Sequence, residues 1–137
     1  MKRAILFLIA ISSLKIVSAQ EQEGFYNVKE LGAKGNGTTS DTKMVNKAIE
    51  DAAAAGGGTI YFPAGNYLLG SVHLRSNICL FIDQGATLVA SSDSTEFDQP
   101  EQSANDTYQD YGHSHWHNSF IWGERIHDVS IMGTGMI

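Results

Sequence analysis

The chain has 137 residues, 15 acidic and 9 basic, with a formal net charge of −6. This length suffices for one small domain. A single cysteine, Cys79, excludes an intrachain disulfide. The acidic balance argues against a nucleic-acid-binding protein, because neutralising phosphates requires clustered lysine and arginine side chains.

Residues 1–19 have the pattern of a secretory signal peptide. Lys2 and Arg3 precede an apolar run over residues 4–14, and Ala19 stands at the expected cleavage position. The run is too short to span a bilayer as a helix. Cleavage would leave 6 basic and 15 acidic residues, a net charge of −9. We expect a secreted or periplasmic protein with no membrane span after cleavage; the alternative is a buried N-terminal helix.

A helix is expected over about residues 41–55. Apolar residues recur there at positions i, i+1, i+4, i+5 and i+8, which places them on one face. Ser40 or Asp41 is expected to cap the helix start, and Gly56 to end it. The glycine-rich residues 32–37 are interpreted as a surface turn, because they lack the Gly-Lys-Ser/Thr ending of a phosphate loop. A one-sided helix here is well placed to cap a solenoid.

Residues 56–90 consist of short, β-branched apolar runs separated by two to four turn residues. The runs cover residues 59–62, 67–69, 72–74, 78–82 and 87–89. This punctuation predicts an all-β architecture, either a meander of hairpins or a parallel solenoid. The meander is the weaker alternative, because no Asn-Gly or Asp-Gly hairpin dipeptide separates the runs.

The sequence also contains a short internal similarity. Residues 77–88 and 128–137 each begin with a polar residue, continue as an alternating apolar strand, and reach a glycine before a second short strand. Between them lie the polar residues 91–118. Insertions of this kind emerge from one turn of a solenoid coil, often on the binding face.

Several motifs in this order resemble the start of one known superfold. They are Tyr-Asn-Val at 26–28, Gly-Ala-Lys-Gly at 32–35, Ala-Ala-Gly-Gly-Gly-Thr-Ile-Tyr-Phe-Pro-Ala-Gly at 54–65, Ser-Asn-Ile at 76–78 and Gly-Ala-Thr-Leu at 85–88. Together they resemble the N-terminus of pectate-lyase-like proteins, particularly glycoside hydrolase family 28, which contains polygalacturonases and rhamnogalacturonan hydrolases.

The resemblance implies a right-handed single-stranded parallel β-helix with an N-terminal capping α-helix. Within residues 20–137 the first coils are expected over 59–90, a loop insertion over 91–118 and the next coil over 119–137. Because a solenoid that stops at Ile137 would leave an open edge, we expect these residues to be the truncated front piece of a longer β-helix.

For function, the resemblance implies inverting hydrolysis of glycosidic bonds in pectic polysaccharide, galacturonan or rhamnogalacturonan, without a cofactor. That reaction uses two carboxyl groups about 6.5–9.5 Å apart. The family's Asn-Thr-Asp, Asp-Asp, Gly-His-Gly and Arg-Ile-Lys segments do not occur in this sequence. We therefore expect no catalytic residue in this chain and no hydrolysis by it alone. The alternatives are a calcium-using, pectate-lyase-like eliminase and a non-catalytic carbohydrate-binding or tailspike-type β-helix.

The residues most suggestive of a site lie in the insertion. His113, His115 and His117 would share one face of an extended segment. Three imidazoles are compatible with zinc, but the resemblance implies no metal and none is predicted. A second interpretation makes His115, Trp116 and His117 substrate-binding, with the indole packed on a sugar. The third is a loop packed on the solenoid flank. Trp122 is interpreted as structural.

Overall fold

A computed structural model describes residues 24–100 and 117–137. The expected signal peptide therefore lies outside the described residues, as do His113, His115 and Trp116. The strands are β1 Phe25–Asn27, β2 Asn36–Ser40, β3 Gly58–Phe62, β4 Gly65–Leu69, β5 Val72–His73, β6 Ile78–Ile82, β7 Ala86–Ala90, β8 Ile121–Trp122 and β9 Ser130–Gly133. The helices are α1 Thr42–Ala54 and the 3₁₀ turn η1 Ser94–Glu96. No helix in the described ranges is long and apolar enough to cross a bilayer.

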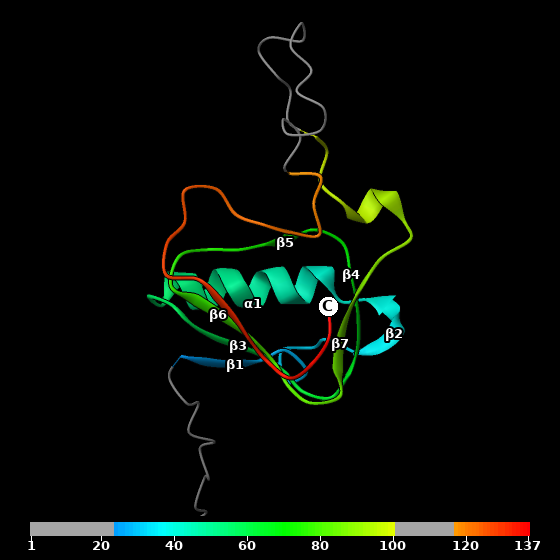
Figure 1. Cartoon of the computed structure of the whole chain (residues 1–137), viewed down its shortest axis with the longest axis horizontal. Helices are drawn as coiled ribbons and strands as arrows, with labels where there is room; N and C mark the ends of the chain where they lie inside the picture. Colours follow the sequence, from blue (N-terminus) through cyan, green and yellow to red (C-terminus); the bar gives the residue numbers. More distant parts are fainter. Residues whose placement is uncertain (1–23, 101–116) are drawn as a thin grey trace, which may run out of the picture.

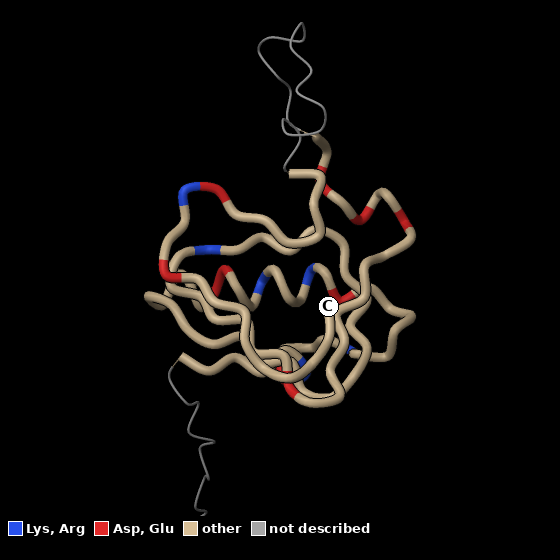
Figure 2. The backbone as a smooth tube through the Cα atoms, in the orientation of Figure 1, with Lys and Arg blue, Asp and Glu red and all other residues tan. Residues whose placement is uncertain are grey.

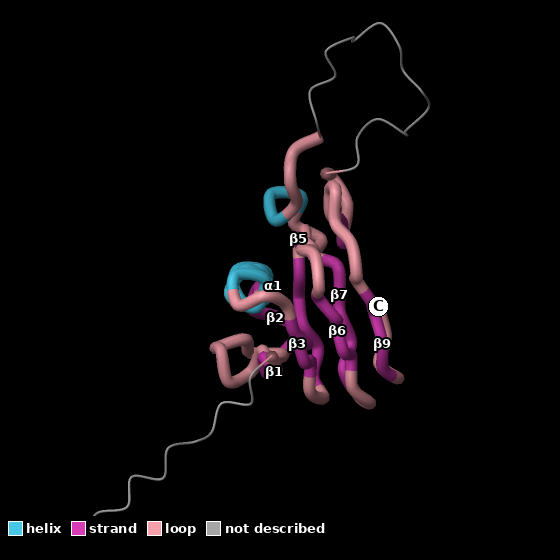
Figure 3. The backbone as a smooth tube through the Cα atoms, turned by 90° about the vertical axis from the view of Figure 1, so that its left-hand side faces the viewer, coloured by secondary structure: helices cyan, strands magenta, loops and turns pink. Residues whose placement is uncertain are grey.

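The strands form three parallel sheets that run along one solenoid. Sheet A has the order β1-β3-β6-β9, sheet B the order β2-β4-β7, and sheet C pairs β5 with β8. Figure 3 shows the coils side by side as successive layers, and Figure 1 looks along the stack. The fold is the expected right-handed parallel β-helix, the hand that parallel crossovers adopt. The alternative of a hairpin meander is excluded, because every strand pairing within residues 24–100 and 117–137 is parallel.

The internal similarity marks two stacked coils. Strand β6 pairs with β9 so that Cys79 lies opposite Ser130, and a bridge joins Thr87 to Met136 one strand further on. The turn residues that precede the two strands also match: Asn77 has φ 63° and Asp128 has φ 54°. Asn and Asp adopt this left-handed backbone conformation more readily than other L-residues, because their short polar side chains can form local hydrogen bonds.

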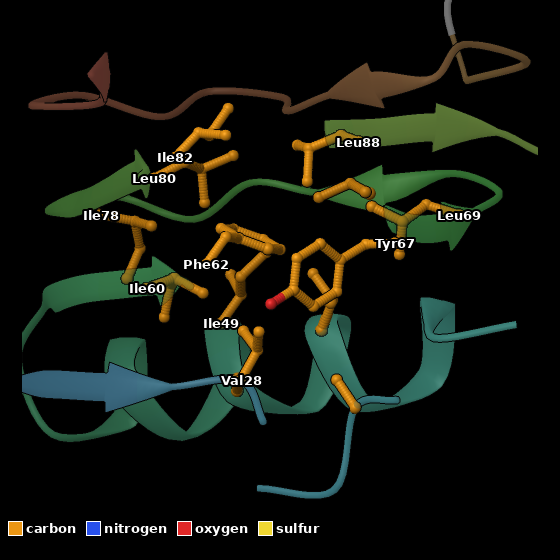
Figure 4. Packing of buried hydrophobic residues seen from close by; sticks show 14 of the residues in the cluster. Val28, Ile49, Ile60, Phe62, Tyr67, Leu69, Ile78, Leu80, Ile82 and Leu88 are labelled. Atoms are coloured by element: carbon orange, nitrogen blue, oxygen red, sulfur yellow. The ribbon is translucent and has the colours of Figure 1, made fainter. Parts of the chain in front are cut away.

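The core lies between the three sheets and the helix. Alternate strand residues point inward. Because successive coils pair in register, each inward residue lies next to its equivalent in the following coil (Figure 4). Phe62 and Tyr67 are fully buried and meet edge to face with ring centroids 5.3 Å apart. The Tyr67 hydroxyl donates to the carbonyl of Pro63 (2.6 Å), and burial is the main cause that raises the pKa of Tyr67 to about 12. Each such side chain contributes about 1.5–3 kcal/mol through burial.

Helix α1 covers one end of the coil stack, as expected for the cap (Figure 3). It buries Val45, Ala48, Ile49 and Ala52. At its end, the N–H of Gly57 donates to the carbonyl of Ala52 (2.8 Å), while Gly56 adopts φ 102°. This arrangement satisfies terminal carbonyls in a turn that favours glycine.

The prediction for the helix start is wrong in its detail. Asp41 occupies the N-cap position but makes no side-chain capping hydrogen bond. Its carboxylate instead accepts from the backbone N–H groups of Lys34 (2.6 Å) and Gly35 (2.8 Å), and the residue is only 1% exposed. The physical reason is that two adjacent N–H groups of the glycine turn converge on the carboxylate. Ser40 donates to Glu96 (2.6 Å) rather than capping.

The glycine-rich segment is also more than a turn. Asn36 and Gly37 begin strand β2, which pairs with β4 between Asn36 and Asn66 and between Ser40 and Leu68. Its residues are exposed or half-buried. The strand therefore carries no apolar alternation that sequence inspection could detect, and its backbone pairing defines it.

Replacing Asp41 by Asn tests the buried carboxylate. An amide offers one acceptor and one donor to two N–H groups, so we expect a loss of about 2 kcal/mol in the free energy of unfolding. Urea denaturation followed by circular dichroism measures it. Asp51→Asn is the matched control: Asp51 is half exposed and pairs with Lys47 along the helix, so its cost should stay within about 0.5 kcal/mol. Equal effects of the two substitutions would contradict the role assigned to Asp41.

Candidate functional site

Sheet C carries the candidate site on its outer face. Strands β5 and β8 pair with Val72 opposite Ile121 and His73 opposite Trp122. Val72 is fully buried in the core. Because side chains alternate along a strand, His73 and Trp122 project side by side from the opposite, outer face.

The carboxylate of Asp98 joins these two side chains. Its Oδ2 atom lies 2.6 Å from His73 Nε2 and accepts a hydrogen bond from Trp122 Nε1 at 2.8 Å. Burial alone would raise the pKa of Asp98, but hydrogen bonds from Trp122 and His73, and attraction to His73, outweigh it and hold the pKa below its usual value. Asp98 is therefore an anion at neutral pH, and its partner His73 Nε2 is the donor.

The backbone around Asp98 fixes both ends of the insertion. Ser71, which is 2% exposed, accepts from the Asp98 N–H (3.0 Å) through its hydroxyl and donates to the Ser119 carbonyl (2.8 Å). The Asn118 side-chain amide donates to the Asp98 carbonyl (2.8 Å). The departing arm, residues 91–100, and the returning segment are thus fastened to the same point of sheet C.

The cap helix supports the same site through Asn46. Its side-chain amide donates to the Ser71 carbonyl (2.8 Å), and its oxygen accepts from the His73 N–H (2.8 Å). One side chain of α1 therefore forms hydrogen bonds with the backbone of β5 and of the residue before it. The position of His73 depends on the cap as well as on the sheet.

Rings flank Trp122 on two sides. The His117 ring lies 4.1 Å from it, centroid to centroid, with an interplanar angle of 32°, and the His73 ring lies 5.2 Å away at 62°. His117 Nε2 is 3.8 Å from Glu124 Oε2. We name His73, Asp98, His117 and Trp122 the flank cluster.

Of the three residues predicted to bind substrate, His117 lies in the flank cluster, whereas His115 and Trp116 lie outside the described residues. Sequence reasoning gave Asp98 no role and treated Trp122 as structural. No motif marks Asp98, because its partners come from elements 25 and 24 residues away.

The cluster suits sugar binding better than metal binding. Within residues 24–100 and 117–137, no three His, Cys, Asp or Glu side chains are grouped to hold a metal ion. An indole and imidazole rings offer apolar faces, and a carboxylate accepts hydrogen bonds from hydroxyl groups. Apolar ring faces beside a hydroxyl acceptor match the two surfaces of a sugar.

Fold and relatives together define a class, the pectate-lyase-like parallel β-helix proteins. Residues 25–135 match the family described as rhamnogalacturonase A/epimerase, pectate lyase-like. Since this match covers most of the sequence, the chain belongs to that family.

Two curated relatives act on uronate polymers. The chain is 44% identical over 66 residues to mannuronan C5-epimerase AlgE5 of Azotobacter vinelandii, covering 48% of this chain and 7% of the epimerase. It is 39% identical over 71 residues to the exo-poly-α-D-galacturonosidase of Dickeya chrysanthemi, covering 52% and 12%. The matched segments thus span a small part of each relative's length.

Solved structures show the same fold over more of the chain. A protein described as a candidate glycosyl hydrolase of Parabacteroides merdae is 28% identical with a TM-score of 0.65, covering 80% of this chain and 41% of that one. The exopolygalacturonase of Thermotoga maritima is 25% identical with a TM-score of 0.64, covering 81% and 24%.

The lowered pKa of Asp98 gives the site a predictable pH response. Its hydrogen bonds stabilise the fold above the unfolded-state pKa, about 3.9, and this contribution is lost as pH falls through the lower folded-state pKa. Asp98→Asn should therefore be about 1 kcal/mol less stable than wild type at neutral pH, and the difference should shrink in acid. Urea titrations across this pH range measure it.

The variant Trp122→Phe serves as an intermediate case. It removes one hydrogen bond to Asp98 and leaves the charges unchanged, so part of the pH dependence should persist. If Asp98→Asn and wild type lost stability in parallel at every pH, the carboxylate would not hold the flank cluster together.

Proposed function

We propose that the chain is the N-terminal portion of a secreted, polygalacturonase-like glycoside hydrolase that degrades pectic polysaccharide. Family membership over residues 25–135 and the galacturonosidase relative support this assignment. The reaction would be inverting hydrolysis by two carboxyl groups. Because the matched segment covers 12% of that relative, we place the catalytic carboxyl groups in coils outside residues 1–137. The signal pattern of residues 1–19 supports secretion.

The observation that carries the proposed role of these residues is the flank cluster. A sugar would pack an apolar face on the rings around Trp122, and its hydroxyl groups would donate hydrogen bonds to the Asp98 carboxylate. Neither residue performs chemistry in this proposal; together they hold the polymer along sheet C. In a solenoid, stacked coils extend such a surface in the direction of the axis.

A second candidate is epimerisation or elimination on a uronate polymer. The 44% identity to the mannuronan epimerase favours it. Hydrolysis releases reducing ends, whereas elimination creates an unsaturated product that absorbs ultraviolet light. The polymer that the chain retains also separates the candidates, since mannuronan and pectic polysaccharide differ in their sugars.

Affinity electrophoresis of the purified chain tests the proposed function. Gels containing methyl-esterified galacturonan or rhamnogalacturonan should retard it more than gels containing mannuronan. Trp122→Ala should weaken the retardation about tenfold, because a sugar-packing ring is lost. Trp122→Phe keeps a ring and should be intermediate, which separates lost contact from misfolding. Phe25→Ala is the matched control, since Phe25 is an aromatic residue of sheet A, 43% exposed.

Two results would contradict the proposal. Retardation that survives Trp122→Ala and disappears in Phe25→Ala would move binding to sheet A. Release of reducing ends from polygalacturonan by the chain itself would show that catalytic carboxyl groups lie within residues 1–137. Stronger retention by mannuronan would favour the second candidate.

A further inference from the structure

We propose that the flank cluster selects uncharged sugar units, such as methyl-esterified galacturonate or a neutral sugar, over free uronate. The proposal rests on the saccharide-binding role proposed above and names the class of sugar. It follows from the charges around Trp122 and from which hydrogen-bonding groups there remain available.

Carboxylates flank Trp122 from two sides. Asp98 bonds the indole N–H directly, and Glu124 lies 3.8 Å from the His117 ring that stacks on the indole. Figure 2 shows these acidic positions along the 91–100 arm and in the turn after β8. A free uronate would bring a further negative charge among them.

The arginines that could receive a uronate each lie near a carboxylate. Arg125 lies 3.4 Å from Glu124, and Arg75 lies 3.8 Å from Glu50. These are the two arginines of the described residues. The His73 ring nitrogen Nε2 is bonded to Asp98. Recognition of a carboxylate depends on charge-assisted donors, above all arginine. The Arg125 side chain is 91% exposed, and the neighbouring carboxylate of Glu124 partly offsets its charge.

The available hydrogen-bonding group is an acceptor. Within the described ranges, both side-chain hydrogen bonds of Asp98 go to Oδ2, and Oδ1 has none. The side chain keeps 34% of its surface exposed. An ionised carboxylate can only accept hydrogen bonds, so it complements sugar hydroxyls. A uronate carboxylate is itself an anion and would be repelled there.

Intrinsic fluorescence provides the test. The chain has two tryptophans, so Trp116→Phe leaves Trp122 as the sole indole reporter. This full-length variant is titrated at pH 7 and low salt with α-1,4-trigalacturonate and with its methyl ester, which share one skeleton and differ in charge. Because one like-charge contact at a partly exposed site weakens binding about fivefold, we expect the ester to bind about fivefold tighter or better. High salt should reduce the difference.

Charge variants assign the effect to the cluster. Asp98→Asn in the same background should reduce the ester preference. The control Asp51→Asn removes the same charge from the cap helix, where Asp51 pairs with Lys47, and should leave the preference unchanged. Circular dichroism confirms that each variant is folded.

The outcomes separate the two proposals. Equal or tighter binding of the free acid, or an unchanged preference in Asp98→Asn, would overturn the selection for uncharged units while leaving a saccharide site in place. If neither trisaccharide changed the Trp122 emission, the saccharide-binding role itself would be overturned, and this inference with it.

Discussion

The in-register stacking of parallel coils is the constraint on which the rest of the structure depends. Each inward side chain packs on its equivalent in the next coil, as Ile60 does on Leu80. The same register places outward side chains in neighbouring positions, which is how His73 comes to lie beside Trp122. A shift of one residue would exchange the two faces and send both side chains into the core. Core packing therefore positions the candidate site together with the site's own hydrogen bonds.

A long insertion can be tolerated in this coil because its two ends are tied at one point. Ser71 forms hydrogen bonds with both Asp98 and Ser119, and the side chain of Asn118 donates a hydrogen bond to the Asp98 carbonyl. Closing a loop costs entropy that grows slowly with its length, so a few hydrogen bonds at its base suffice to hold the ends. The same ties bring an acidic side chain from the insertion onto the rings of sheet C.

The sequence allowed the main architecture to be predicted because its signals are local. Short apolar runs, the glycines after the helix and the similar residues 77–88 and 128–137 each report on nearby backbone. Strand β2 escaped prediction because its polar residues bury no face, and the role of Asp41 because a turn several residues earlier competes for its carboxylate. Asp98 could not be identified either, since only the fold brings it to His73 and Trp122.

The central claim is that sugar binds to the outer face of sheet C. Sheet A offers a rival surface, where three aromatic rings follow one another along the stack. The ring centroid of Tyr61 lies 5.1 Å from that of Phe25 and 6.0 Å from that of Phe81. Titrating the isotopically labelled chain with methyl-esterified trigalacturonate, and following its amide and indole NMR signals, distinguishes the two faces. The account predicts that the largest shifts fall on β5, β8 and the Trp122 indole N–H. Shifts concentrated at Tyr61 and Phe81, with the Trp122 signal unmoved, would contradict it.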